Sequence, residues 1–110
     1  MSGRAARIGQ NENLFREVNE RIEELGERFG VHETGMFRIV CECGYEQCAE
    51  PIDLPVVEYR AVREDPHRFF VVRGHEIPDV ERVVLEREEY VVLEKLPGVP
   101  AEVAEEGAPR

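Results

Sequence analysis

The chain has 110 residues, a length that allows one small domain. Its 24 acidic and 14 basic side chains give a formal net charge of −10, which disfavours broad contact with nucleic acid or an anionic membrane. No apolar run approaches the roughly 18 residues of a membrane span, so we expect a cytoplasmic protein. The chain has a single serine, Ser2, and no glycine-rich phosphate loop, which argues against a serine nucleophile and against nucleotide binding.

Residues 1–10 contain two arginines and few apolar side chains, and they predict a disordered arm. Residues 11–29 carry apolar side chains at the spacing of an amphipathic helix. We expect the main apolar stripe of this helix to pack inward. The stripe consists of Leu14, Val18, Ile22, Leu25 and Phe29. Phe15 lies about 100° from Leu14 around the axis, so it either fills the edge of the core or is an exposed anchor for a second chain.

The middle of the chain predicts a strand, a polar loop and a second helix. Residues 36–43 alternate between two faces as a strand does, and residues 44–51 form a polar loop, called the knuckle below. Residues 55–64 begin with a proline, which suits the first helical position, and end before Asp65-Pro66. We expect Val57 and Ala61 on the inner side of this helix, with Tyr59 and Val62 as further candidates.

The last third of the chain predicts strands and then a tail. Residues 69–72 are a continuous apolar run, typical of a buried strand. Residues 80–86 and 90–96 are rich in β-forming side chains and predict a hairpin with its turn at 87–89. Residues 97–110 have too little apolar content to pack, and we expect a disordered acidic tail.

The three cysteines lie within eight residues of one another, at Cys41, Cys43 and Cys48. Cys41 and Cys43 are two residues apart at the end of a strand, so both side chains leave the same face. Gly44 permits a sharp reversal that brings Cys48 back toward them. Three converging thiolates form a soft-ligand site, and Zn²⁺ takes four such ligands in a tetrahedron.

The fourth ligand is predicted to be His75, because it follows a strand and a tight turn at Arg73-Gly74. If residues 69–72 pair beside residues 36–43, this turn directs the side chain of His75 toward the cysteines. His67, His32, a water or a carboxylate are the alternatives. The cysteines also admit other interpretations: small core residues, a Cys41–Cys48 disulfide with one thiol left over, or a redox-switched thiol set.

These elements predict an α+β fold with two helices packed on a small, mostly antiparallel sheet with a zinc knuckle. Residues 11–96 would form one zinc-stabilised domain, between the arm at 1–10 and the tail at 97–110. One structural Zn²⁺ per chain would compensate for the thin core of a domain this small.

Three stretches resemble a family of small uncharacterised bacterial proteins, chiefly from actinobacteria. The first is the helix segment N-E-N-L-F-R-E-V-N-E-R-I at residues 11–22. The second is Cys41-Glu42-Cys43-Gly44 with Cys48, and the third is Gly74-His75-Glu76 with Pro78. The resemblance covers most of residues 11–95 and implies that the three cysteines and the Gly-His occur together, but it implies no settled activity.

The sequence favours a non-catalytic module that binds another protein or a second copy of itself, because three thiolates and one histidine leave no open position on zinc. One alternative is a zinc- or thiol-dependent enzyme with Glu42, Glu46, Glu50 or Glu76 as general base. Another is nucleic-acid contact through the knuckle, with Tyr45 at its tip and Arg68 and Arg73 nearby. The wider basic strip of Arg60, Arg63, His67, Arg68 and Arg73 is more typical of a solvated face.

Overall fold

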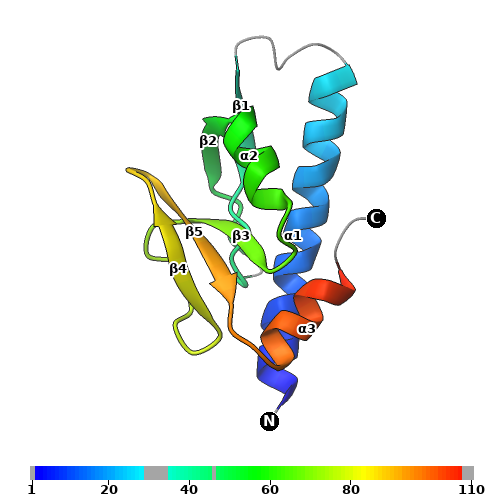
Figure 1. The fold of residues 1–110 in the computed structure, drawn as a ribbon, viewed down its shortest axis with the longest axis vertical. Helices are drawn as coiled ribbons and strands as arrows, with labels where there is room; N and C mark the ends of the chain where they lie inside the picture. The colour runs from blue at the N-terminus through cyan, green and yellow to red at the C-terminus, as the bar shows by residue number, and fades with distance from the viewer. Residues whose placement is uncertain (1, 29–34, 46, 108–110) are drawn as a thin grey trace.

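The computed structural model describes residues 2–28, 35–45 and 47–107. In chain order, its elements are α1 (Ser2–Arg28), β1 (Met36–Val40), β2 (Pro51–Pro55), α2 (Val56–Arg63), β3 (Arg68–Val72), β4 (Glu81–Glu86), β5 (Tyr90–Lys95) and α3 (Val99–Glu106). The α+β class predicted from the sequence is confirmed, with three helices and two small antiparallel sheets in the described part of the chain (Figure 1).

The strands form two separate sheets rather than one. Strands β1 and β2 pair in a hairpin whose register runs from Met36 opposite Pro55 to Val40 opposite Pro51. The second sheet has the order β3-β5-β4, and the predicted hairpin of β4 and β5 is present. β3 therefore pairs with β5, and it lies beside the C-terminal end of the predicted strand 36–43 rather than along β1. Its other edge faces the cysteine segment, where the N–H of Glu42 donates to the carbonyl of Phe70 at 2.8 Å.

The apolar core lies between the two sheets and α2. Tyr59 of α2 stacks on Phe70 of β3 with ring centroids 5.5 Å apart, and Phe37 of β1 meets Tyr59 edge-on at 5.0 Å. The strand β5 is central in its sheet and buries four successive apolar side chains, Tyr90 to Leu93. These contacts join both sheets and the short helix into one core.

Helix α1 packs on this core with the face opposite to the predicted one. Glu12, Arg16 and Asn19 are buried, whereas Leu14, Val18 and Leu25 are 57%, 41% and 44% exposed. The prediction of an inward apolar stripe was therefore wrong. The polar side chains occupy the buried face because each has hydrogen-bond or ion-pair partners there. These interactions offset the cost of removing the side chains from water.

The first residues belong to α1, so the expected disordered arm at 1–10 is wrong for residues 2–10. The helix extends over them because they pack against α3, as Figure 1 shows at the N-terminal half of α1. A Cβ placed on Gly9 would lie 2.8 Å from Cγ1 of Val103, so only glycine allows this close helix crossing. Residues 29–34, where we expected the end of the helix, lie outside the described residues.

The expected disordered tail at 97–110 is likewise wrong for its described part, where Val99–Glu106 is the helix α3. Val103 and Ala104 are buried, and Arg16 of α1 donates a hydrogen bond of 2.7 Å to the carbonyl of Ala104. The segment has few apolar residues. The side chains of Val103 and Ala104 and the carbonyl group of Ala104 are nevertheless enough to hold α3 against α1, because α1 offers a matching surface.

Helix α2 begins at Val56, with Pro55 as its N-cap, and it is rotated relative to our expectation. Val57 is 79% exposed and Ala61 is also exposed, so their predicted inward positions are wrong, whereas Tyr59 and Val62 are buried as suggested. Tyr59 and Val62 together bury more apolar surface against the sheet than Val57 and Ala61 would, which favours the observed rotation. None of the described helices is both long enough and apolar enough to cross a membrane.

Candidate metal centre

The three cysteines lie in the loop that joins β1 to β2. The hairpin ladder continues one step past β1, where the N–H of Cys41 donates to the carbonyl of Glu50 at 2.8 Å. A turn then returns the chain, with the N–H of Cys48 donating to the carbonyl of Tyr45 at 3.1 Å. Local backbone hydrogen bonds thus bring Cys48 to the same point as Cys41 and Cys43.

His75 reaches this point from the loop between β3 and β4. The N–H of His75 donates to the carbonyl of Val72 at 2.9 Å and closes a four-residue turn. Gly74 has φ of 91° in this turn, a conformation that favours glycine. The sequence predicted this turn from Arg73-Gly74-His75, and the turn places the imidazole beside the cysteines.

The ligand atoms of Cys41, Cys43, Cys48 and His75 all lie within 4.8 Å of one another. Nδ1 of His75 is 3.6 Å from Sγ of Cys41 and 3.6 Å from Sγ of Cys48. Cys41 and Cys43 are buried, and the other two residues are partly buried. The four residues selected from the sequence therefore converge, as residues that share a metal ion do.

The second nitrogen of His75 has its own partner, because Nε2 lies 3.1 Å from a carboxylate oxygen of Glu50. A carboxylate accepts a hydrogen bond, so the ring proton belongs on Nε2 and the lone pair of Nδ1 faces the sulfurs. Metal-bound histidines are commonly oriented by such a carboxylate. From the sequence, Glu50 was a candidate only as a general base, and this orienting role was missed.

The sulfur atoms also receive hydrogen bonds. The N–H of Val72 donates to Sγ of Cys41 at 3.2 Å. As free thiols, Cys41 and Cys43 share a proton: the hydrogen bond from Cys41 lowers the pKa of Cys43 to about 5, while the same bond and burial raise the pKa of Cys41. Closely spaced thiols of this kind hold one thiolate readily, and a cation that binds them would relieve the repulsion of further thiolates.

Glu42 lies between two of the cysteines in sequence but does not face the sulfur cluster. Its carboxylate is fully buried and accepts hydrogen bonds from the Asn19 amide at 2.7 Å and from the N–H of Phe70 at 3.0 Å. The same carboxylate forms an ion pair with the buried guanidinium of Arg63. These contacts tie the cysteine segment to α1, β3 and α2.

The remaining candidates lie elsewhere or have other partners. His67 is beside Glu105, with Nε2 2.7 Å from a carboxylate oxygen, and it is not part of the cluster. Glu76 accepts a hydrogen bond of 2.9 Å from the N–H of Gly74. His32 and Glu46 lie outside the described residues.

The basic strip noted in the sequence is paired with acidic side chains. Arg60 lies 2.9 Å from Glu23, and Arg63 pairs with Glu42. The ring nitrogens of His67 lie 3.4 Å from Asp65 and 2.7 Å from Glu105. Arg68 pairs with Asp65 and Glu94, and Arg73 pairs with Glu86. These ion pairs neutralise the charges that a phosphate backbone would need.

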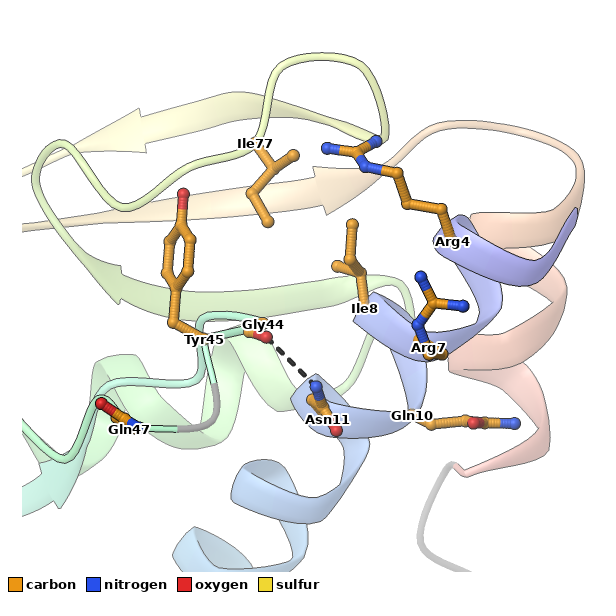
Figure 2. Close-up of a pocket in the computed structure, with 9 residues that line it drawn as sticks. All are labelled: Arg4, Arg7, Ile8, Gln10, Asn11, Gly44, Tyr45, Gln47 and Ile77. Carbon is orange, nitrogen blue, oxygen red and sulfur yellow. Dashed lines mark hydrogen bonds between the residues drawn. The ribbon is translucent and has the colours of Figure 1, made fainter. Parts of the chain in front are cut away.

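A recess with a volume of about 840 Å³ lies between the knuckle and the first turns of α1, as Figure 2 shows. Its lining residues are Arg4, Arg7, Ile8, Gln10, Asn11, Gly44, Tyr45, Gln47 and Ile77. Asn11 donates a hydrogen bond of 3.2 Å to the carbonyl of Gly44 and so fixes the knuckle to α1 (Figure 2). None of the four cluster residues lines this recess, so the cluster does not open into it.

Comparisons with protein-family models, with curated proteins and with solved structures give no significant match. The interpretation of the site therefore rests on its own geometry and chemistry.

Proposed function

We propose that Cys41, Cys43, Cys48 and His75 bind one structural Zn²⁺ and that the chain acts as a non-catalytic module for protein interaction. The observation that carries the proposal is the distance of 3.6 Å from Nδ1 to each of two sulfurs. Typical bond lengths of about 2.3 Å for Zn–S and about 2.0–2.1 Å for Zn–N give a sulfur–nitrogen edge of about 3.6 Å in a tetrahedron. The donor set of three thiolates and one imidazole also suits zinc.

A structural role is favoured over a catalytic one because four protein side chains are available to the metal and the nearby acidic residues have other partners. Four protein ligands fill a tetrahedral zinc ion, whereas catalytic zinc keeps one position for water. The acidic residues near the cluster have other partners, because Glu42 binds Arg63 and Glu50 orients His75. When bound, the zinc ion would hold the β1–β2 loop and the β3–β4 loop together.

The test is metal analysis of the purified chain, in which we expect close to one zinc per chain. Cys41→Ser and His75→Ala should lose most of the metal, whereas His67→Ala is the matched control and should keep it. Chelation should lower the unfolding temperature by many degrees, because binding free energy at a structural zinc site contributes to folding. A chain that retains its stability under chelation, or retains zinc after His75→Ala, would refute the proposal.

Cobalt substitution separates the structural proposal from the enzymatic alternative. Co²⁺ bound by three thiolates and one imidazole should give intense d–d absorption of a tetrahedral site together with sulfur-to-metal charge-transfer bands. Small ligands such as azide should leave this spectrum unchanged if all four positions are occupied by the protein. A spectral change on adding azide would point to an open position and to catalysis.

A further inference from the structure

The outward face of α1 is apolar and has no partner among the described residues. Leu14, Val18 and Leu25 are 57%, 41% and 44% exposed, and they lie on the side of the helix opposite to the buried Glu12 and Arg16. Successive residues of a helix are separated by about 100°, so the three side chains form one stripe along its axis. Large exposed apolar side chains arranged contiguously are typical of an interaction surface.

This stripe, together with Ile22 and two charged residues, forms a shallow groove. Its lining residues are Leu14, Glu17, Val18, Arg21, Ile22 and Leu25. Helix α3 does not cover it, because α3 packs on another side of α1, where Asn13 donates a hydrogen bond of 2.8 Å to the carbonyl of Val103. Within residues 2–28, 35–45 and 47–107, only α1 lines this groove, which leaves it accessible to an approaching chain.

The spacing of the groove residues is that of the seam between two paired helices. Leu14, Val18, Arg21 and Leu25 follow one another at intervals of 4, 3 and 4 residues, as the seam positions of a heptad repeat do. The seam is apolar except at Arg21. The charge of Arg21 therefore decides which partner and which orientation the groove accepts.

We propose that the outward face of α1 pairs antiparallel with α1 of a second copy of this chain. The pairing places Leu14 of one copy opposite Leu25 of the other and Arg21 beside Val18 and Glu17 of the other, and the two-fold axis repeats each contact. A parallel pair would instead bring Arg21 directly against Arg21, and like charges at one layer repel. In the antiparallel pair each Arg21 lies between Glu17 of the other copy and Glu24 of its own helix, whose carboxylate is 4.0 Å away.

The inference rests on the interaction role proposed above, but it does not depend on the zinc site. A single helix pair buries less than the roughly 800 Å² per partner of a standard interface, so we expect a weak dimer that forms in the micromolar range. Dimerisation and metal content can therefore be measured separately on the same sample.

The test is sedimentation velocity of the full chain over a range of concentrations, with metal content and circular dichroism as checks of folding. We expect a monomer–dimer equilibrium for the natural chain. Val18→Lys should shift it to monomer, because a lysine would face Arg21 of the other copy. Val57→Lys is the matched control: Val57 is 79% exposed on α2, away from this face, and the variant should dimerise as the natural chain does.

A charge reversal tests the orientation. Arg21→Glu should raise the dissociation constant of the dimer at least tenfold, because the variant places several acidic side chains close together at the seam. The double variant Glu17→Arg/Arg21→Glu should restore the dimer if the helices are antiparallel, since the arginine introduced at position 17 would then meet the glutamate introduced at position 21 of the other copy. Failure of the double variant to recover would overturn the antiparallel pairing.

Two further outcomes would overturn the proposal as a whole. A natural chain that remains monomeric at every concentration would remove the second copy as the occupant of this face. Loss of the dimer in Val57→Lys, with zinc and helix content retained, would place the interface on α2 instead. If zinc is absent from all variants while the dimer behaves as expected, the zinc proposal fails and this inference stands.

Discussion

Glu42 is the residue that connects the cysteine knuckle to the rest of the molecule. Its carboxylate is fully buried and meets α1 through Asn19, β3 through the N–H of Phe70 and α2 through Arg63. A buried ion pair of this kind adds little to the stability of the fold compared with an apolar pair of similar volume. Removal of one member is nevertheless costly, because the other charge is left without compensation in the core. Arg63 keeps a second carboxylate, because Glu20 lies 2.9 Å from its Nε.

We predict that Glu42→Gln lowers the free energy of unfolding by about 3 kcal/mol, near the lower end of the values for a broken buried pair, because Glu20 still compensates part of the charge of Arg63. Urea denaturation of the zinc-loaded protein would measure the change. The variant should still bind one zinc per chain, since Glu42 does not face the sulfurs.

Asp53→Asn is the control for Glu42→Gln, because it removes the partner of Arg38 from an ion pair on the surface of the β1–β2 hairpin. We expect no measurable change in the denaturation midpoint for this exposed pair. If the two variants behaved alike, the carboxylate of Glu42 would have no special role in stability.

At the scale of whole elements, the crossing of α1 and α3 depends on the absence of a side chain at Gly9. A Cβ at this position would be only 2.8 Å from Cγ1 of Val103. Alanine is the better helix former, so the sequence context alone would predict that Gly9→Ala stabilises α1 by up to about 1 kcal/mol. The close contact predicts the opposite sign.

We predict that Gly9→Ala lowers the free energy of unfolding by about 1 kcal/mol, because overpacking costs roughly 1–3 kcal/mol and exceeds the gain in helix propensity. Thermal denaturation would measure this loss. The double variant Gly9→Ala/Val103→Ala should show a favourable coupling between the two sites, since the shorter side chain makes room for the new methyl group.

Gly3→Ala is the matched control in the same helix. A Cβ at Gly3 would lie 3.7 Å from the nearest atom, in Arg7, which is an ordinary contact. This variant should be neutral or slightly stabilising. A stabilising effect of Gly9→Ala as well would show that α3 does not pack tightly on α1.

In α1, the periodicity of the apolar residues predicts the helix but not which face of the helix is buried. The spacing of Leu14, Val18 and Leu25 correctly indicates a helix but gives the wrong inner face. The buried Arg16 finds its partners at Pro66 and Ala104, which are 50 and 88 residues away along the chain. No local pattern contains that information, so the polar face could not be recognised as the inner one.

The metal cluster was easier to predict because most of its geometry is local. Cys41, Cys43 and Cys48 are brought together by one hairpin loop, and the turn at Gly74 can be read from the sequence around His75. The role of Glu50 could not be predicted, since it depends on how the β3–β4 loop lies against the knuckle. The structure brings together the four chosen side chains, and metal binding by them remains a prediction.

At the scale of the whole molecule, a buried charged cluster joins α1 to the three-stranded sheet. Nζ of Lys95 lies 2.5 Å from Glu12 and 2.7 Å from Glu81, and all three side chains are inaccessible to water. Burial, and then the neighbouring Glu81, raise the pKa of Glu12 well above its usual value of 4.5, against the opposing effect of Lys95. The folded state therefore binds a proton at Glu12 more tightly than the unfolded state does.

We predict that Glu12 makes the protein more stable at low pH than at neutral pH, relative to Glu12→Gln. The contribution is fully present below the unfolded pKa near 4.5 and is lost as the pH rises through the higher folded pKa. Urea denaturation of both proteins at several pH values would measure the difference. Loss of zinc at low pH affects both proteins equally and cancels in this difference.

Parallel stability curves for the natural protein and Glu12→Gln would mean that Glu12 has the same proton affinity in the folded and unfolded states, and they would contradict this prediction.

The long-range partners of α1 also set an order of events in time. Glu12 and Arg16 leave the ribosome before their partners Lys95 and Ala104, which follow 83 and 88 residues later. Until then the buried Glu12 lacks the ammonium group of Lys95 and Arg16 lacks the carbonyl group of Ala104, so a helix docked earlier would bury these polar groups at a high cost. The pairing of β4 with β5 is local in sequence, so this hairpin can form before α1 docks. We therefore expect the first element in the sequence to be among the last to dock.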